Sequence, residues 1–175
     1  STSRRQRQMC IRDRLRTAYY ALVDSILQYG ILIWGDSAER ERIFRLQRKA
    51  VRILGGAQHR DDCRHLFKTL QIMTYPNTYI YQCLLHAHRS VFSDANLPRQ
   101  KDIHSHKTRL GENIRTPFHR LKRSRNGVNY YSYEFYNLLP NEIRNKSFQV
   151  YKKLLKDLLT RNPFYSIEEF RAFSF

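Results

Sequence analysis

Helical periodicity is the feature that most restricts how this chain can fold. Apolar residues recur at spacings of three or four from Leu15 to Trp34, with no proline among them, and Gly35 follows as a helix stop. A second apolar period runs to Leu54 and ends at two glycines. The pattern predicts two helices joined by a short turn, the first becoming buried on all sides over 31–33. The residues predicted to face inward from the first helix are Leu15, Ala18, Leu22, Ile26 and Tyr29.

The second of these helices has a basic side. Asp36 is a candidate N-cap, and Glu39 follows at the capping-box spacing. After Glu41 this helix has no further acidic residue to neutralise its cations. The predicted apolar stripe consists of Ile43, Leu46, Ala50 and Leu54. Nearly opposite that stripe, at helical spacings, lie Arg45, Arg48, Lys49 and Arg52.

Further helices are predicted along the rest of the chain. A short one covers 62–70, and a longer one over about 77–91 begins at Thr74-Tyr75-Pro76, which is typical of a helix start. Residues 94–129 are polar and basic without a sustained period, and helical periodicity returns only after them. We therefore expect a mainly α fold. Its predicted parts are a small helical bundle over 15–92, a basic linker over 93–129 and a C-terminal helical segment over 130–175.

Residues 1–14 form a separate part of the chain in this interpretation. The stretch 8–14 reads like the in-frame translation of an adaptor used to build sequencing libraries, so we expect 1–14 to be an assembly scar. The alternative is an ordinary basic tail. These residues carry five arginines and one aspartate, so removing them lowers the net charge only from +17 to +13.

The net charge points to a polyanionic partner. Lysine and arginine total 32 against 15 acidic residues, and each cation that contacts a phosphate releases condensed counterions. This charge favours nucleic acid over an anionic membrane surface or an acidic protein. No apolar stretch is long enough to span a bilayer, and three cysteines form no disulfide framework. We therefore expect an intracellular protein without a secretory leader and without a membrane partner.

No catalytic or metal-binding constellation emerges from the sequence. Asp61-Asp62 is the only adjacent aspartate pair, but it is typical of a helix N-cap and first turn rather than of a metal-binding hairpin. Cys63 with His65, and Cys83 with His86, match no zinc-ligand spacing. We therefore expect no catalytic residue, no metal ligand and no cofactor in this chain.

Two basic segments supply the candidate binding residues. The row Arg45, Arg48, Lys49 and Arg52 could follow a phosphate backbone or could be a solvated helix face, and the sequence leaves these about even. The basic run in the linker could be a disordered loop, a nuclear-import signal or a phosphate contact, and all three stay open. Its cations are Arg120, Lys122, Arg123 and Arg125.

Several short motifs occur in a characteristic order along the chain. They are Leu27-Gln28-Tyr29-Gly30, Leu46-Gln47-Arg48-Lys49-Ala50-Val51-Arg52, Leu66-Phe67-Lys68-Thr69-Leu70, Thr108-Arg109, Tyr136-Asn137-Leu138-Leu139-Pro140 and Phe164-Tyr165-Ser166-Ile167-Glu168-Glu169-Phe170. In their order and spacing, the chain resembles the region downstream of the palm in Jockey-like LINE reverse transcriptases of non-LTR retrotransposons. Such elements usually have a Tyr-containing stretch before Thr-Arg, and His106 stands near that place here.

The resemblance implies a role in positioning nucleic acid. In this family the thumb is a helical unit that grips the template–primer duplex, and the helix with Gln47, Arg48, Lys49 and Arg52 would belong to it. Arg109 would join the binding residues through its Thr-Arg motif. The palm and fingers, with the aspartates that bind magnesium, would lie upstream. We therefore expect a fragment that contacts RNA–DNA hybrid in the nucleus but does not polymerise by itself.

Two other classes remain open. A free-standing nucleic-acid-binding protein derived from the element would be a folded, monodisperse domain whose binding depends strongly on salt. An inactive translated relic would expose apolar surface where the palm once packed. An upstream reading frame that contains an aromatic-x-Asp-Asp motif would favour the fragment, and a nearby start codon would favour the free-standing protein.

Overall fold

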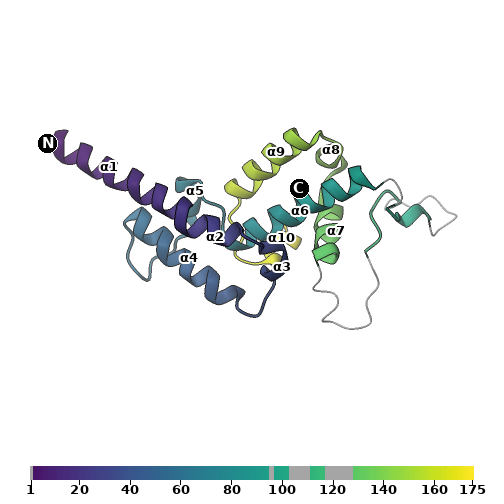
Figure 1. The fold of residues 1–175 in the computed structure, drawn as a ribbon, viewed down its shortest axis with the longest axis horizontal. Helices are drawn as coiled ribbons and strands as arrows, with labels where there is room; N and C mark the ends of the chain where they lie inside the picture. Colours follow the sequence, from purple (N-terminus) through teal and green to yellow (C-terminus); the bar gives the residue numbers. More distant parts are fainter. Residues whose placement is uncertain (1, 95–96, 103–110, 117–127) are drawn as a thin grey trace.

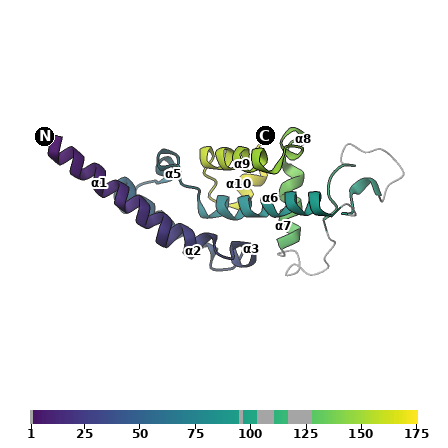
Figure 2. The same cartoon turned by 45° about the horizontal axis from the view of Figure 1, so that its top comes forward.

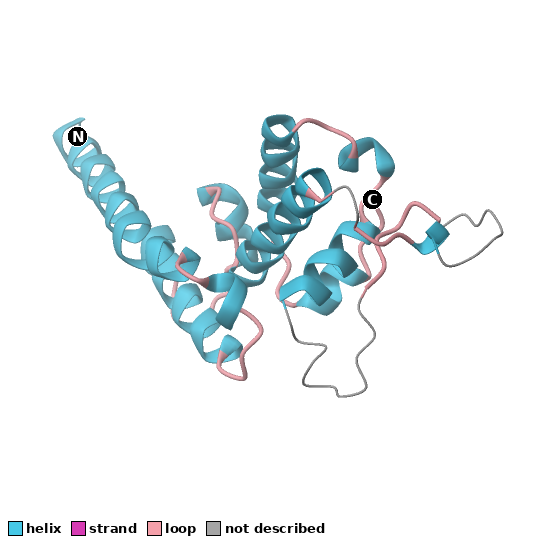
Figure 3. Cartoon of the chain, turned by 45° about the vertical axis from the view of Figure 1, so that its right-hand side comes forward, coloured by secondary structure: helices cyan, strands magenta, loops and turns pink. Residues whose placement is uncertain are grey.

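The structure is a computed structural model that describes residues 2–94, 97–102, 111–116 and 128–175, with side chains from Cys10 onward. Within these ranges the regular structure is helical (Figures 1 and 3). The same ranges contain no strand, only an isolated antiparallel bridge between Arg99 and Ile114. The predicted mainly α fold is therefore confirmed.

A long helical arm forms the N-terminal side of the molecule. It consists of α1 (Thr2–Ala18), a π-helical stretch η1 (Tyr19–Asp24) and α2 (Ser25–Gln28), and the N-terminal end of α1 projects away from the other helices (Figures 1 and 2). Gly30 then adopts a φ of 61°, a left-handed conformation that glycine tolerates, before α3 (Ile31–Trp34) begins. The prediction of one unbroken helix to Trp34 is therefore wrong, because the helix ends before Gly30 and restarts after it.

The buried face of this arm also differs from the prediction. Tyr19, Leu27 and Ile31 are buried, whereas Ile33 is 88% exposed, so 31–33 is not covered on all sides. A π-helical turn takes more residues than an α-helical turn, which rotates the residues after Tyr19 relative to a 3.6-residue pattern. All five side chains that we predicted to face inward are exposed: Leu15, Ala18, Leu22, Ile26 and Tyr29.

Helix α4 (Arg40–Gly55) follows, and it ends where Gly56 takes a φ of 67°. Glu39 occupies the N-cap position without a side-chain cap, and the Asp36 carboxylate instead accepts a hydrogen bond from the Arg40 guanidinium. The predicted capping role of Asp36 is therefore wrong. The predicted apolar stripe is also displaced, because Leu46 is exposed while Gln47 is buried. The buried face of α4 consists of Phe44, Gln47, Val51 and Leu54.

Helix α6 (Tyr75–Ser93) is the centre of the fold. Thr74 caps its N-terminus by accepting a hydrogen bond from the Asn77 backbone, with proline in the first turn, so the predicted start of this helix is confirmed. Helices α7 and α9 pack against α6, α9 alongside it and α7 across it (Figure 2). The remaining helices are α5 (Arg64–Leu70), η2 (Gln100–Asp102), α7 (Val128–Leu138), α8 (Asn141–Arg144), α9 (Phe148–Arg161) and α10 (Ile167–Arg171).

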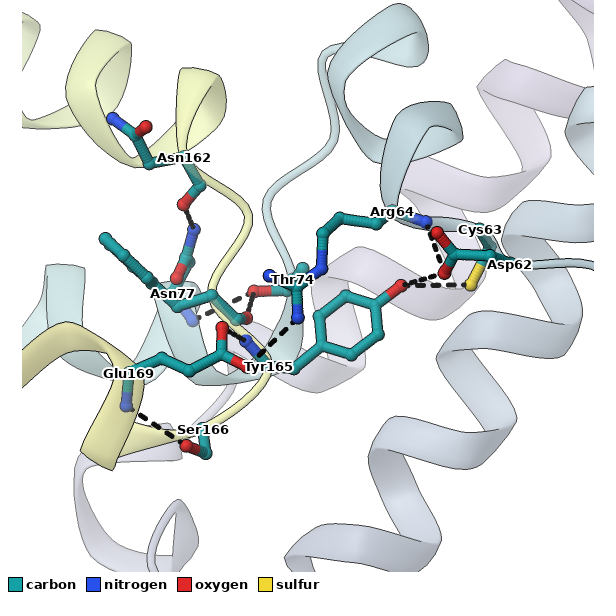
Figure 4. Close-up of polar contacts among 10 residues, drawn as sticks. Asp62, Cys63, Arg64, Thr74, Asn77, Asn162, Tyr165, Ser166 and Glu169 are labelled. Atoms are coloured by element: carbon teal, nitrogen blue, oxygen red, sulfur yellow. Dashed lines mark hydrogen bonds and ion pairs between the residues drawn. The ribbon is translucent and has the colours of Figure 1, made fainter. Parts of the chain in front are cut away.

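The C-terminal helices share one apolar core with α4 to α6. Polar contacts also join the two parts (Figure 4). Asn77 Nδ2 donates to the backbone carbonyls of Leu159 at 2.6 Å and Asn162 at 2.8 Å, and Thr74 Oγ1 donates to the carbonyl of Phe164 at 2.6 Å. Because these buried donors are satisfied only by the C-terminal segment, the segment over 130–175 stabilises the start of α6.

Candidate nucleic-acid interface

The basic row on α4 has two cations that point into solvent. Arg45 and Lys49, one helical turn apart, are both exposed. Among the residues that the structure describes, no ion pair involves either of them, nor Arg48 or Arg52. Carboxylates therefore do not neutralise this row, and Arg45 and Lys49 are available to contact phosphate.

The other two cations of the row are held by the protein itself. The Arg48 guanidinium lies 4.9 Å from the centroid of the Phe44 ring and 5.8 Å from that of Tyr165, and its Nε is buried without a hydrogen bond. Arg52 Nε donates to the Asp61 carbonyl at 2.8 Å. The row is therefore not four equivalent cations on a free face. Arg48 packs on aromatic rings in a cation–π contact, and the backbone of the loop after α4 orients Arg52.

A second cationic surface lies between α1 and α9. A groove of about 790 Å³ is lined by side chains from both helices and by Gln71 at the end of α5. One acidic residue, Asp157, lies in its lining, and its carboxylate already pairs with Arg161 at 2.9 Å. The Tyr20 ring also lines the groove, with the Arg16 guanidinium 5.8 Å from its centroid. The cations in the lining are Arg16, Lys153, Lys156 and Arg161.

We did not predict this groove from the sequence. Tyr151, Leu155 and Leu159 gave α9 an apolar stripe, and they are fully buried as that stripe requires. Lys153 and Lys156 lie on the exposed side of the same helix, where a lysine is ordinarily only a solvated charge. The available indication was that the exposed side of α9 is rich in lysine, but nothing local in the sequence places it opposite Arg16.

The linker candidates fall in unplaced parts of the chain. Arg109, Arg120, Lys122, Arg123 and Arg125 all lie outside the described residues. Their predicted contacts with phosphate therefore stay predictions.

The aspartates and cysteines considered as catalytic or metal-binding candidates have structural roles. Asp61 accepts a hydrogen bond from the Gln58 backbone at 2.8 Å, and Asp62 accepts one from the Arg64 backbone at 3.2 Å. Burial raises the pKa of the Cys83 thiol to about 12, which keeps it protonated at neutral pH. In the described ranges, no three His, Cys, Asp or Glu side chains lie close enough together to hold a metal ion.

Comparisons with known proteins gave no match to a protein-family model, a curated protein or a solved structure. Among the described helices, none has the length and apolar character needed to cross a membrane. Exposed, unneutralised cations on α4 and a cation-lined groove beside α9 are suited to bind an extended polyanion.

Proposed function

We propose that this chain binds nucleic acid and is the C-terminal part of a Jockey-like non-LTR retrotransposon reverse transcriptase. Its partner would be RNA–DNA hybrid or a template–primer duplex. The observation that carries the proposal is the groove between α1 and α9, where Arg16, Lys153 and Lys156 lie beside the Asp157–Arg161 ion pair. Arg45 and Lys49 add a second contact on α4, which lies on the other side of α1 from α9 (Figure 1).

The arrangement favours contact with the phosphate backbone over reading of bases. Lysine ammonium groups and flexible arginines contact phosphates irrespective of sequence, and each contact contributes to the salt dependence of binding. Such contacts suit a unit that positions a duplex rather than one that selects a sequence. Polymerisation, with its magnesium ions, would then belong to the palm of the same enzyme.

An exposed apolar surface fits a piece of a larger enzyme, and it fits equally an inactive relic that has lost the palm. A groove of about 190 Å³ between α1 and α4 is lined almost wholly by apolar side chains, among them Leu15, Leu22 and Ile53. Leu22 is 66% exposed and Ile53 is 67% exposed. Contiguous apolar surface of this kind is typical of an interface. On our proposal it packs against the palm and fingers of the polymerase.

A free-standing nucleic-acid-binding protein is the second candidate. The apolar core that α4 to α6 share with the C-terminal helices favours it, because residues of this chain alone build that core. The two candidates make the same prediction for nucleic acid and differ for the apolar groove. A free-standing protein should remain monodisperse in solution with that groove uncovered.

The first test is charge reversal on α4. We expect Arg45→Glu with Lys49→Glu to weaken binding to RNA–DNA hybrid about tenfold near 0.1 M salt, because two phosphate contacts are lost. Fluorescence anisotropy with a labelled hybrid measures the affinity, and circular dichroism checks that the helix content is unchanged. Arg48 is left intact, because its replacement would disturb the aromatic packing of Phe44 and Tyr165.

The matched control exchanges the two residue types. Arg45→Lys with Lys49→Arg keeps both charges at the same exposed positions and should bind hybrid as the unaltered chain does. If the double glutamate variant binds as tightly as this control, α4 does not contact the hybrid.

A further inference from the structure

A pocket at the C-terminal end of α6 has no part in the surfaces described above. It has a volume of about 450 Å³, within the range of roughly 300–1,000 Å³ typical of small-ligand sites. Its lining comes from the end of α6, from α7 and α8, and from the two short segments joined by the bridge between Arg99 and Ile114. The charged residues in the lining are Arg99, Arg144 and Glu112.

Hydrogen bonds fix the wall of this pocket. The Asn137 side chain accepts from the Ile114 backbone N–H at 2.9 Å and donates to the Ile114 carbonyl at 2.8 Å. Backbone bonds then join the two short segments, from Arg115 to Pro98 at 2.9 Å and from Gln100 to Asn113 at 3.0 Å. The segment over 111–116 is therefore anchored to α7 and cannot close the pocket without losing these bonds.

The two guanidinium groups in the pocket are unequally neutralised. Glu112 accepts from Arg99 at 2.7 Å and from Lys101 at 3.0 Å, so each of its carboxylate oxygens already has a cationic donor. Among the described residues, Arg144 forms no ion pair: Nη1 donates to the Asn113 side chain at 3.0 Å, and Nε is buried without a hydrogen bond. Burial, and to a lesser extent the positive charge of Arg99, lower the pKa of Arg144. A bound anion would favour the charged form of Arg144 and would therefore oppose both causes of the lowered pKa.

An aromatic surface adjoins these cations. Phe92 lines the pocket and is 65% exposed, while its ring stacks on His88 with centroids 4.5 Å apart. His88 in turn stacks on the buried ring of Tyr151 at 4.1 Å. This supported stack holds Phe92 in place, and its exposed surface can accept a planar base.

We infer that this pocket binds a single nucleotide, with the phosphate on Arg144 and Arg99 and the base against Phe92. Guanidinium groups match the geometry of phosphate oxygens, and an aromatic ring stacks on any base. The nucleotide could be free or could be the phosphorylated end of a nucleic-acid strand, since both present the same chemistry. No residue of the α1–α9 groove or of α4 lines this pocket.

The test measures binding of adenosine monophosphate, adenosine and inorganic phosphate by isothermal titration calorimetry. We expect the monophosphate to bind at least tenfold more tightly than adenosine. Arg144→Gln, which keeps an amide donor for Asn113 but removes the charge, should weaken monophosphate binding about tenfold or more. Phe92→Ala should weaken binding of the monophosphate but not of inorganic phosphate.

Two outcomes would overturn the inference: equal binding of adenosine and its monophosphate, or unchanged monophosphate binding by both variants. Because the Phe92 side chain is mostly exposed, its replacement tests the pocket even if Arg144→Gln unfolds the chain. A 5′-phosphorylated single-stranded oligonucleotide, compared with its 5′-hydroxyl form, separates a strand end from a free nucleotide. Arg45→Glu with Lys49→Glu should leave monophosphate binding unchanged. The proposed nucleotide site can therefore be disproved without disproving the proposed binding of RNA–DNA hybrid.

Discussion

Replacing Gln47 with alanine is expected to lower the free energy of unfolding by about 3–5 kcal/mol, since the change leaves buried polar groups without partners. Gln47 is 1% exposed, although it lies in a strongly basic helix. Its Nε2 donates to the Tyr19 hydroxyl at 2.9 Å and to the Met73 carbonyl at 3.0 Å. Its Oε1 accepts from the Tyr75 backbone at 2.7 Å. One side chain thereby joins the N-terminal arm, α4 and the start of α6.

Thermal unfolding followed by circular dichroism measures this effect, and we expect the midpoint to fall by roughly 10 °C. Gln149→Ala, at an exposed position on α9, is the matched control and should change stability by no more than about 0.5 kcal/mol. Gln47→Met retains most of the volume without the amide. If Gln47→Met is as stable as the unaltered chain, the hydrogen bonds of Gln47 contribute nothing and the prediction is wrong.

Reversing two charges in the groove between α1 and α9 should have the largest effect on binding. We expect Lys153→Glu with Lys156→Glu to weaken binding of RNA–DNA hybrid about thirty- to hundredfold near 0.1 M salt. Two phosphate contacts are lost, and two carboxylates are placed in a concave surface that already holds Asp157. On the convex surface of α4 a strand can move away from a reversed charge, so the effect there should be smaller.

The control for this prediction uses two lysines that are close to Lys153 and Lys156 in the sequence but do not line the groove. Lys146→Glu with Lys152→Glu changes the net charge by the same amount, at two exposed positions outside the groove lining. We expect this control to lose much less affinity than the groove variant. Equal losses would mean that binding responds to net charge alone and that the groove is not the contact.

The start of α6 was predicted correctly from the sequence because it depends on local chemistry. Thr74 followed by Pro76 placed the start of α6 correctly, because an N-cap and a first-turn proline act within a few residues. Ser166 likewise caps α10 through a contact within three residues, by accepting from the Glu169 backbone at 3.2 Å. Such features need no knowledge of distant parts of the chain.

The buried faces of the helices were less predictable, for two physical reasons. The π-helical stretch over 19–24 changes which side chains of the arm face the core. No residue type in that stretch indicates a π-helix. Gln47 occupies a core position that an apolar stripe would assign to a neighbour, because its partners come from 26 to 28 residues away in the chain. Polarity alone could not reveal that its hydrogen bonds are satisfied inside.

The candidate site was predicted only in part, since it depends on tertiary contacts. The α4 row was identified from spacing, but Arg48 stacks on Tyr165, a residue more than a hundred positions later. The groove brings Arg16 together with Lys153, which no local pattern can do. Contacts between residues far apart in the sequence therefore decide which cations pack against the protein and which can contact phosphate.

The most direct test of our central claim is the salt dependence of RNA–DNA hybrid binding by this chain. The unaltered protein should show a steep negative slope of log Kobs against log salt concentration. Combining the glutamate substitutions at Arg45, Lys49, Lys153 and Lys156 should reduce the magnitude of that slope by about 3–4, at about 0.9 for each lost phosphate contact. A slope that is the same for both proteins would contradict the proposal that these two helix surfaces hold nucleic acid.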